Sequence, residues 1–308
     1  MVEAALYDPD FGFYETGGAA GRRGDFLTSP EVGPLFGTVL ARAIETWWAE
    51  LGSPDSFTVV DAGAGRGALR AAITKACRAP VRYVAVERSS ALRAEDSVAE
   101  LPGAPFTGVV VANELLDNLP FGLLERTADG WAEVRVDEAR REVLVPVEGP
   151  SLEARVGARI PVQVAARAWV EAALGLVQAG RVVVFDYADT TASMAQRPWT
   201  DWVRTYRRHG RGGHPLTDLG DQDVTCEVAV DQLPPPTSNR SQADFLRAHG
   251  LDELVDEARR AWEERAHIGD LSALIARSRV TEAAALTDPA GLGAFRVLEW
   301  VKKRSSGP

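Results

Sequence analysis

The sequence contains few residues of several types, and each shortage argues against certain kinds of protein or site. Only two cysteines occur, Cys77 and Cys226, far apart and without a Cys-x-x-Cys pair. Neither a disulfide framework nor a cysteine zinc site is therefore indicated, and a reducing compartment fits. The four histidines lack metal-ligand spacing and no Ser-His-Asp context stands out. The sequence therefore predicts neither a metal site nor a serine-hydrolase triad.

Positive charge and long apolar runs are also scarce. The formal net charge is -10, and lysine occurs only as Lys75, Lys302 and Lys303. Such an acidic chain disfavours non-specific binding of nucleic acid. No apolar run approaches the roughly 20 residues of a membrane span. Glu3 and Asp8 stand where a signal peptide would be basic and then apolar. We therefore expect a cytoplasmic protein with no membrane insertion and no nucleic-acid partner.

What is present is organised around one strand, turn and helix. The residues from Phe57 to Val60 are apolar or β-branched, as in a strand buried on both faces, and Asp61 ends the run. Glycines then occupy alternate positions: Gly63, Gly65 and Gly67. Helix formers follow from Ala68 to Cys77. This pattern predicts the opening unit of an open parallel sheet, with a sharp turn that lets a polar or anionic ligand approach the helix start.

A second strand supplies a partner for this turn. The run Val81 to Glu87 (Val-Arg-Tyr-Val-Ala-Val-Glu) is predicted as a strand and ends in an acid, 20 residues after Gly67. A carboxylate there accepts hydrogen bonds from ribose hydroxyls, which S-adenosylmethionine (SAM) and NAD both carry. The glycines fit the G-x-G-x-G loop of SAM methyltransferases and, with Ala68, the G-x-G-x-x-A form of dinucleotide sites. From these residues alone both cofactors stay open, as does a glycine turn without a ligand.

Polar side chains follow the next strand directly. Phe106 to Ala112 is predicted as a buried strand, and Asn113, Glu114 and Asp117 come immediately after it. Ligands of open α/β sheets bind beyond the carboxyl ends of the strands. These three residues are therefore the candidate catalytic residues, although capping of a following helix is the alternative.

The remaining chain predicts an insertion and a further strand. Leu123 to Val147 alternates weakly around the turn Asp129-Gly130, which predicts a β-hairpin or short meander. Val162 to Gln178 reads as a helix, and Arg181 to Tyr187 as the fifth parallel strand. We predict an N-terminal lid and helix in 1–56, a core in 57–120 and 181–308, and an inserted hairpin and helix in 121–180.

The C-terminal third is mixed in character. Aromatic residues and arginines interleave in 199–214, a pattern that can stack nucleotide bases, although a solvated loop with its aromatics packed underneath is favoured. Ser241 to Arg277 has helical periodicity. The strands Thr225–Val230 and Ala294–Val301, at either end of this helical segment, suit an antiparallel terminal hairpin.

Several segments, in this order, resemble one family. They are Leu6-Tyr-Asp-Pro with Gly12-Phe-Tyr, Gly24-Asp-Phe-Leu-Thr-Ser-Pro-Glu, the glycine turn, Ala112-Asn-Glu with Asp117 and Leu119-Pro, Phe185-Asp-Tyr, Tyr206-Arg-Arg-His, Asp221-Gln-Asp and Gly291-Leu-Gly-Ala-Phe-Arg-Val. Together they are similar to the MidA-like SAM-dependent methyltransferases, relatives of the mitochondrial complex I assembly factor. The resemblance covers nearly the whole chain and favours SAM over NAD.

The resemblance implies an α/β fold. It is a class I SAM-methyltransferase Rossmann-like sheet with an inserted β-hairpin and helical region and a helical segment before the last strand. It also implies methylation of protein arginine. Among the residues that it places at the cofactor are those of the Gly24–Glu31 stretch. The expected cofactor-binding residues are Asp61, Gly63, Gly65, Gly67, Glu87, Asn113, Asp25, Phe26, Thr28, Ser29, Pro30 and Glu31.

Two positions depart from the family pattern. Asp61 stands where the family commonly has Glu, and Ala188 where Gly is usual. The acceptor is therefore either a protein or a small molecule of a specialised pathway. A non-catalytic SAM-binding assembly factor and an NAD-dependent oxidoreductase are the other readings, and a nucleic-acid methyltransferase ranks last. A homodimer through the inserted hairpin is also open.

Overall fold

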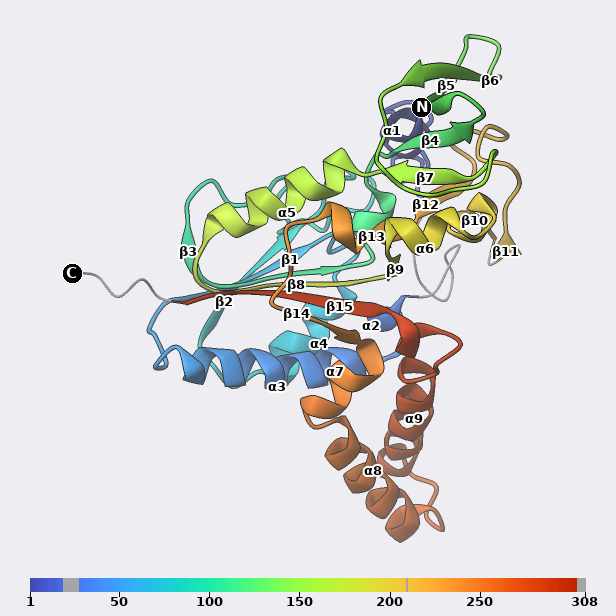
Figure 1. The fold of residues 1–308 in the computed structure, drawn as a ribbon. Helices are drawn as coiled ribbons and strands as arrows, with labels where there is room; N and C mark the ends of the chain where they lie inside the picture. Colours follow the sequence, from blue (N-terminus) through green and yellow to red (C-terminus); the bar gives the residue numbers. More distant parts are fainter. Residues whose placement is uncertain (19–27, 209, 304–308) are drawn as a thin grey trace, which may run out of the picture.

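The computed structural model describes residues 1–18, 28–208 and 210–303, and its centre is one six-stranded sheet (Figure 1). The strand order is β14-β15-β8-β3-β1-β2. These strands are β1 (Phe57–Ala62), β2 (Val81–Val86), β3 (Phe106–Asn113), β8 (Val177–Asp186), β14 (Ser238–Ser241) and β15 (Arg296–Lys302). Strands β2, β1, β3 and β8 are parallel, whereas β15 and β14 add an antiparallel edge. The α/β class and its Rossmann-like sheet are thus confirmed.

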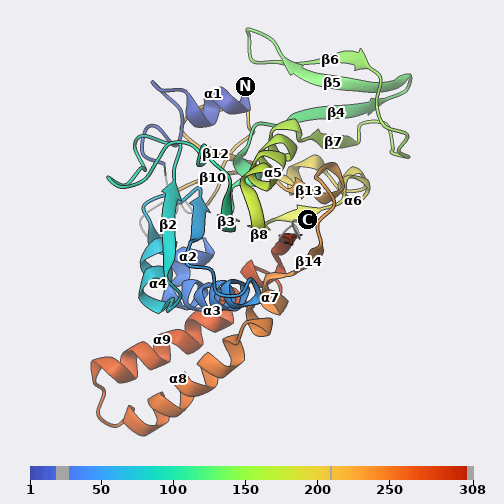
Figure 2. The same ribbon diagram turned by 90° about the vertical axis from the view of Figure 1, so that its left-hand side faces the viewer.

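Helices cover both faces of this sheet, which explains why its central strands β1 and β3 are largely apolar and buried. Val59 and Val111 pack under helices α3 (Pro34–Glu50), α4 (Ala68–Ala76) and α7 (Gln242–Ala248). On the other face, Val60 and Val110 pack against α5 (Val164–Leu176). Successive strand residues point to opposite faces, so a strand covered on both sides must be apolar at every position. Figure 2 shows α5 on one side of the sheet and α3, α4 and α7 on the other.

Two strand predictions need correction. Arg181–Tyr187 was expected as the fifth parallel strand, but β8 is the fourth, because residues 88–105 form a loop with a single bridge from Val86 to Val98. The antiparallel partner of β15 is β14 and not Thr225–Val230. That stretch contributes to β12 (Asp223–Cys226), which pairs with β10 (Val203–Arg207) in a separate three-stranded sheet.

The insertion is larger than a hairpin. It is an antiparallel sheet of four strands in the order β6-β5-β4-β7. Its strands are β4 (Gly122–Thr127), β5 (Gly130–Val136), β6 (Glu142–Val147) and β7 (Arg159–Val162). The predicted turn at Asp129-Gly130 joins β4 to β5. The helix expected within this insertion, α5, packs instead on the central sheet, because Ala166, Val170 and Ala173 form one apolar stripe.

The arginine-aromatic segment 199–214, expected as a solvated loop, contains regular secondary structure. It holds a 3₁₀ turn (Trp199–Asp201), strand β10 and the short strand β11 (Gly210–Arg211), while His209 lies outside the described residues. Trp202 is fully buried beside Met194 and Cys226, so its ring offers no face to a nucleotide base.

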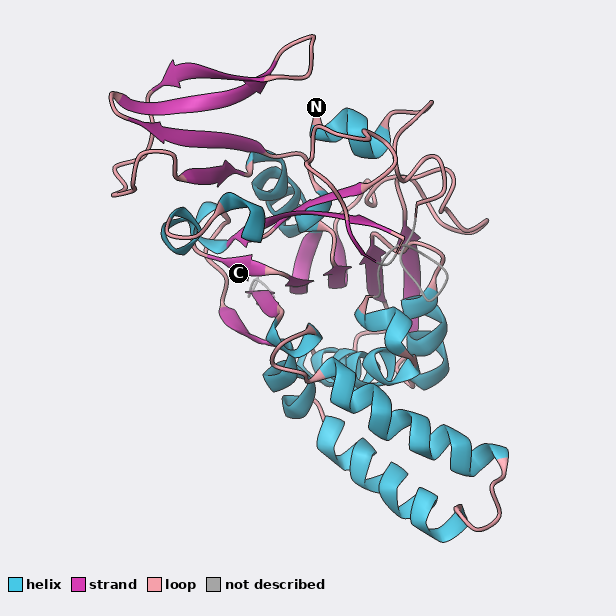
Figure 3. Ribbon diagram, turned by 90° about the vertical axis from the view of Figure 1, so that its right-hand side faces the viewer, coloured by secondary structure: helices cyan, strands magenta, loops and turns pink. Residues whose placement is uncertain are grey.

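The helical segment near the C-terminus is not one helix. After α7, a left-handed Gly250 starts α8 (Leu251–Arg265), and α9 (Leu271–Leu286) returns beside it. This pair projects from the body of the molecule (Figure 3). The short elements are α1 (Val2–Tyr7), α2 (Ser29–Val32), α6 (Thr191–Ala195), β9 (Ala188–Asp189), β13 (Val228–Ala229) and the 3₁₀ turns η1 (Leu116–Asn118), η3 (Val230–Gln232) and η4 (Leu292–Ala294). Among the helices of the described ranges, none has the length and apolarity to cross a bilayer.

Glycine is required where β3 passes closest to β1. A Cβ at Gly108 would lie 1.9 Å from the carbonyl oxygen of Thr58, and the backbone φ of Gly108 is +155°. Gly108→Ala is therefore expected to lower the free energy of unfolding by about 3 kcal/mol, the upper end of ordinary overpacking costs. Urea denaturation measures this change. Gly103→Ala is the control, since its Cβ would meet nothing within 4 Å. An equal loss in both variants would contradict this explanation.

Candidate functional site

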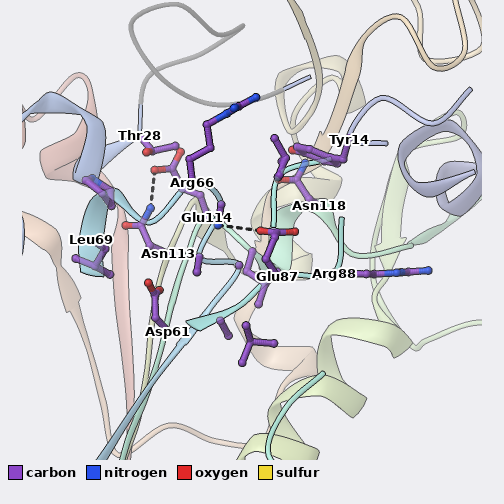
Figure 4. Close-up of a pocket in the computed structure, with 18 of the residues that line it drawn as sticks. Tyr14, Thr28, Asp61, Arg66, Leu69, Glu87, Arg88, Asn113, Glu114 and Asn118 are labelled. Atoms are coloured by element: carbon purple, nitrogen blue, oxygen red, sulfur yellow. Dashed lines mark hydrogen bonds between the residues drawn. The ribbon is translucent and has the colours of Figure 1, made fainter. Parts of the chain in front are cut away.

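A cavity of about 520 Å³ opens beyond the carboxyl ends of β1, β2 and β3 (Figure 4). Its walls include the glycine turn, the ends of these strands, η1 and part of the N-terminal segment. This is the edge at which open α/β sheets bind ligands, because the loops there diverge and leave backbone groups free. The volume lies in the range of small-molecule sites, which is roughly 300–1,000 Å³.

The glycine turn has the backbone conformation that its sequence predicts. Gly63, Gly65 and Gly67 have φ angles of +73°, +50° and +85°. Side chains are strained at such angles, so glycine is needed for the turn itself. Gly63 and Gly65 line the cavity. Gly67, expected among the cofactor residues, does not line it and instead begins α4.

Glu87 lies directly against the glycine turn on the cavity wall. Its Oε2 accepts a hydrogen bond from the Gly65 N–H at 2.9 Å, and its Oε1 accepts one from the Ser89 N–H at 2.9 Å. Burial raises the pKa of Glu87, while these two N–H donors oppose that rise. The carboxylate is thus oriented by backbone at the end of β2 and remains on the cavity wall.

Asp61 lies deeper, at the end of β1. Its side chain is 3 % exposed and lines the cavity. Oδ2 accepts a hydrogen bond from the Tyr83 hydroxyl at 2.8 Å. Burial raises the pKa of Asp61 to about 6, although the Tyr83 hydrogen bond acts against it. The carboxylate that ends β1 is therefore held by a neighbouring strand and directed at the ligand space.

Glu114 is held both by its backbone and by its side chain. Its φ of +51° is left-handed, and its N–H donates to the Phe185 carbonyl at 2.8 Å. Oε1 accepts from Asn113 Nδ2 at 3.0 Å and from the Ser29 N–H at 3.4 Å. Asn113 Oδ1 is buried and has no hydrogen-bond partner among the described residues. A left-handed non-glycine residue costs of order 1–3 kcal/mol, which points to a functional requirement at this position.

Further carboxylates lie behind Glu114. Asp117 and Asp186 are 3 % and 0 % exposed, and neither lines the cavity. Burial raises the pKa of Asp117, and the charges of Asp186 and Asp223 add to it. Burial also raises the pKa of Asp186, even though it accepts backbone N–H bonds at the start of η1. We call Glu114, Asp117, Asp186 and Asp223 the acidic cluster. Burial and mutual repulsion favour the protonated forms of Glu114, Asp117 and Asp186, and a cationic ligand group in the cavity would favour their ionised forms instead.

The N-terminal candidates fall into three groups. Thr28, Pro30 and Glu31 line the cavity. Ser29 is fully buried behind the wall, where its hydroxyl donates to Gln242 Oε1 at 3.0 Å. Asp25 and Phe26 lie outside the described residues. Ser29 therefore contacts Glu114 through its backbone and does not itself face the ligand space.

Several wall residues were not among the candidates from sequence. Tyr7, Tyr14, Arg88 and Asn118 all line the cavity. Figure 4 shows Tyr14 and Asn118 on the side of the cavity opposite Thr28. The signal for the tyrosines was the unusual aromatic run at the start of the chain, but nothing in that run shows that it folds back over the sheet.

The raised pKa of Glu114 predicts a pH-dependent cost in stability. Burial, and then the Asp117 charge, raises this pKa to about 8. Between the ordinary pKa of glutamate and pH 8, the unfolded chain is ionised and the folded one keeps its proton, so stability falls by at most about 1.4 kcal/mol per pH unit. Glu114→Gln should therefore raise the melting temperature. Its gain over wild type should grow from pH 5 to 8 and then level off, as thermal denaturation across pH would show; a gain independent of pH would contradict this cause.

With this geometry established, the chain was compared with known proteins. A family described as "Putative S-adenosyl-L-methionine-dependent methyltransferase" matches residues 39–248. Protein arginine methyltransferase NDUFAF7 of Mus musculus is 26 % identical over 326 residues, covering 83 % of this chain and 72 % of the relative. The Drosophila melanogaster homologue is 36 % identical over 74 residues, covering 24 % of this chain and 17 % of its own length.

A solved structure has a similar fold across the whole chain. It is a COG1565 superfamily member from Burkholderia thailandensis bound to S-adenosyl-homocysteine, with a TM-score of 0.79 and 26 % identity. The match covers 99 % of this chain and 89 % of that one. The resemblance to MidA-like methyltransferases is thus confirmed, and the NAD-dependent reading is set aside.

The expected cytoplasmic location is wrong on this comparison. The relatives named above are designated mitochondrial, in mouse and in Drosophila alike. The lack of a signal-peptide pattern and the low cysteine count argue only against secretion into an oxidising compartment. They do not distinguish the cytoplasm from the mitochondrial interior. The family match spans residues 39–248, and the glycine turn and Glu87 line one cavity at the carboxyl edge of the sheet. The protein therefore belongs to the family of S-adenosyl-L-methionine-dependent methyltransferases.

Proposed function

We propose that SAM is held between the glycine turn and Glu87. Gly63 and Gly65 let the backbone approach the methionine portion, Asp61 binds its amino group, and Glu87 accepts hydrogen bonds from the ribose hydroxyls. Two observations support the binding of SAM in this cavity. The cavity has the volume of a small-molecule site, and the buried Asn113 Oδ1 has no hydrogen-bond partner among the described residues, so it can accept a hydrogen bond from the ligand. When bound, SAM supplies an electrophilic methyl group. The protein's tasks are then to orient the acceptor and exclude water, which is worth at most roughly 7–11 kcal/mol.

We further propose that the acceptor is the guanidinium of a protein arginine. The observation that carries this proposal is Glu114, a carboxylate held at the cavity by a strained backbone and two hydrogen bonds. A carboxylate binds a planar guanidinium through parallel N–H bonds and fixes its orientation. The relatives' name, protein arginine methyltransferase, supports the same acceptor.

Glu114 and its neighbours have different roles in this proposal. Glu114 accepts N–H bonds from the guanidinium and takes the proton that the nitrogen loses when it is methylated. In the free protein the pKa of Glu114 is about 8, and the positive charge of a bound guanidinium lowers it, so that Glu114 is ionised in the complex and can accept the proton. Asn113 keeps the carboxylate in place. Asp117, which the sequence suggested as a direct contact, acts from behind the wall through its charge on Glu114.

Labelled methyl transfer tests this function. The purified protein is incubated with isotope-labelled SAM and a lysate, and labelled proteins are digested and analysed by mass spectrometry. Methylated arginine is the expected product. Label on a small molecule, on lysine or on nucleic acid would overturn the arginine assignment. SAM binding measured by calorimetry without any transfer would favour a non-catalytic assembly factor.

A further inference from the structure

The first residues of the chain form a packed wall of the cofactor cavity. Helix α1 and the turns up to residue 18 lie on β12, where Leu6 and Phe13 are buried against Val224. Tyr7 and Tyr14 stack with ring centroids 5.6 Å apart, and both line the cavity. This wall consists of residues 2–18 and is called the N-terminal wall below. It is sequence-distant from every strand that it covers, so specific contacts must hold it there.

One buried carboxylate joins this wall to the turn η1. Asp223, at the start of β12, is 1 % exposed. Its Oδ1 accepts hydrogen bonds from the Tyr14 hydroxyl and from Asn118 Nδ2, each at 3.0 Å. Asn118 belongs to η1, the turn that follows Glu114, and its carbonyl accepts from the Tyr7 hydroxyl at 3.4 Å. Because one carboxylate oxygen of Asp223 accepts from both elements, Asp223 is placed to fix them relative to each other.

The same wall is tied to the acid at the end of β2. The Ser89 hydroxyl donates to the Tyr14 carbonyl at 2.8 Å, and the Ser89 N–H donates to Glu87 Oε1 at 2.9 Å. Ser90 adds a hydrogen bond from its hydroxyl to Glu15 at 2.7 Å. Residue 14 thus stands between Glu87 and Asp223 in one continuous chain of hydrogen bonds. These hydrogen bonds set the position of the N-terminal wall, against which a ligand bound to Glu87 lies.

We propose that Asp223 is a positioning residue for cofactor binding: through Tyr14 and Asn118 it fixes the N-terminal wall against η1, so that the cavity is preformed when the cofactor reaches Glu87. Preformed sites bind more tightly because no ordering of the wall is needed on binding. The proposal concerns cofactor affinity and is independent of which acceptor is methylated.

Affinity for S-adenosylhomocysteine, measured by calorimetry, tests this proposal. Tyr14→Phe removes only the hydroxyl and should raise the dissociation constant about tenfold, a change equal to about 1.4 kcal/mol. Asp223→Ala should raise it at least as much. Since both changes break the same link, the double variant should be no weaker than the weaker single variant. Asp221→Ala is the matched control, because Asp221 is an exposed acid two residues before Asp223 that pairs with Arg207 and does not line the cavity, and it should change affinity less than threefold.

Hydrogen exchange separates positioning from general stability. In the wild type, S-adenosylhomocysteine should slow amide exchange in both the N-terminal wall and the glycine turn. In Tyr14→Phe the glycine turn should still be protected at saturating ligand, whereas protection of the wall should be reduced. Wild-type affinity in both single variants, multiplied effects in the double variant, or unchanged wall protection in Tyr14→Phe would each overturn the proposal. Because Tyr14→Phe keeps the ring packing, it tests the idea even if Asp223→Ala fails to fold.

Discussion

Glu114→Gln is expected to lower methyl transfer by about 10²- to 10³-fold while SAM affinity stays within about threefold. The amide keeps the shape and can still accept from Asn113, but it carries no charge for a guanidinium and takes no proton. Losing one partner of a buried, hydrogen-bonded charge pair costs roughly 2–5 kcal/mol, which sets this magnitude. Steady-state transfer of labelled methyl to the identified substrate, together with calorimetry for SAM, measures both quantities.

The control is a glutamate with an ion pair far from the cavity. Glu125 pairs with Arg159 at 2.8 Å within the inserted sheet, so Glu125→Gln should leave turnover near wild type. Undiminished transfer by Glu114→Gln would end the proposed role of Glu114. Equal loss of SAM binding and turnover would instead show that Glu114 serves the cofactor.

Glu87→Ala is expected to weaken SAM binding by about 10²- to 10⁴-fold. The variant removes two charge-assisted acceptors for the ribose hydroxyls, and each hydrogen bond to a charged group is worth roughly 1.5–3 kcal/mol. It also leaves the N–H groups of Gly65 and Ser89 without their acceptor, which loosens the glycine turn. Calorimetric titration with SAM and with S-adenosylhomocysteine measures the loss.

Glu95→Ala is a suitable comparison for Glu87→Ala. Glu95 is an exposed acid in the loop that follows β2, and it does not line the cavity. Its removal should leave affinity unchanged, because only the general negative charge of the loop is altered. If both variants bound SAM as well as wild type, the ribose contact would lie elsewhere on the cavity wall.

The sequence determined the features that depend on neighbouring residues along the chain. The apolar run before Asp61, the alternate glycines and the acid that ends β2 follow from local rules for buried strands and tight turns. In a parallel sheet the carboxyl ends of the strands lie at one edge. Asp61, Glu87 and Glu114 could therefore be expected around one cavity, and the structure brings all three to its wall.

Features that depend on distant contacts were beyond the sequence. Thr225–Val230 has as good a strand pattern as Ser238–Ser241, yet β14 pairs with β15 and β12 pairs with β10. A pattern of period two states that a segment is a strand but not which strand is its neighbour. That Asp117, a candidate catalytic residue, is buried in η1 and does not line the cavity also depends on distant contacts.

The N-terminal wall shows most clearly where the two kinds of information divide. The aromatic turn at residues 6–14 is visible in the sequence, and so is Asp223 in its own motif. Only the tertiary structure brings Tyr14 to Asp223, across 209 residues, with one hydrogen bond of 3.0 Å. Local preference fixes the conformation of a turn, but the long-range packing of Leu6 and Phe13 on β12 decides which cavity that turn closes.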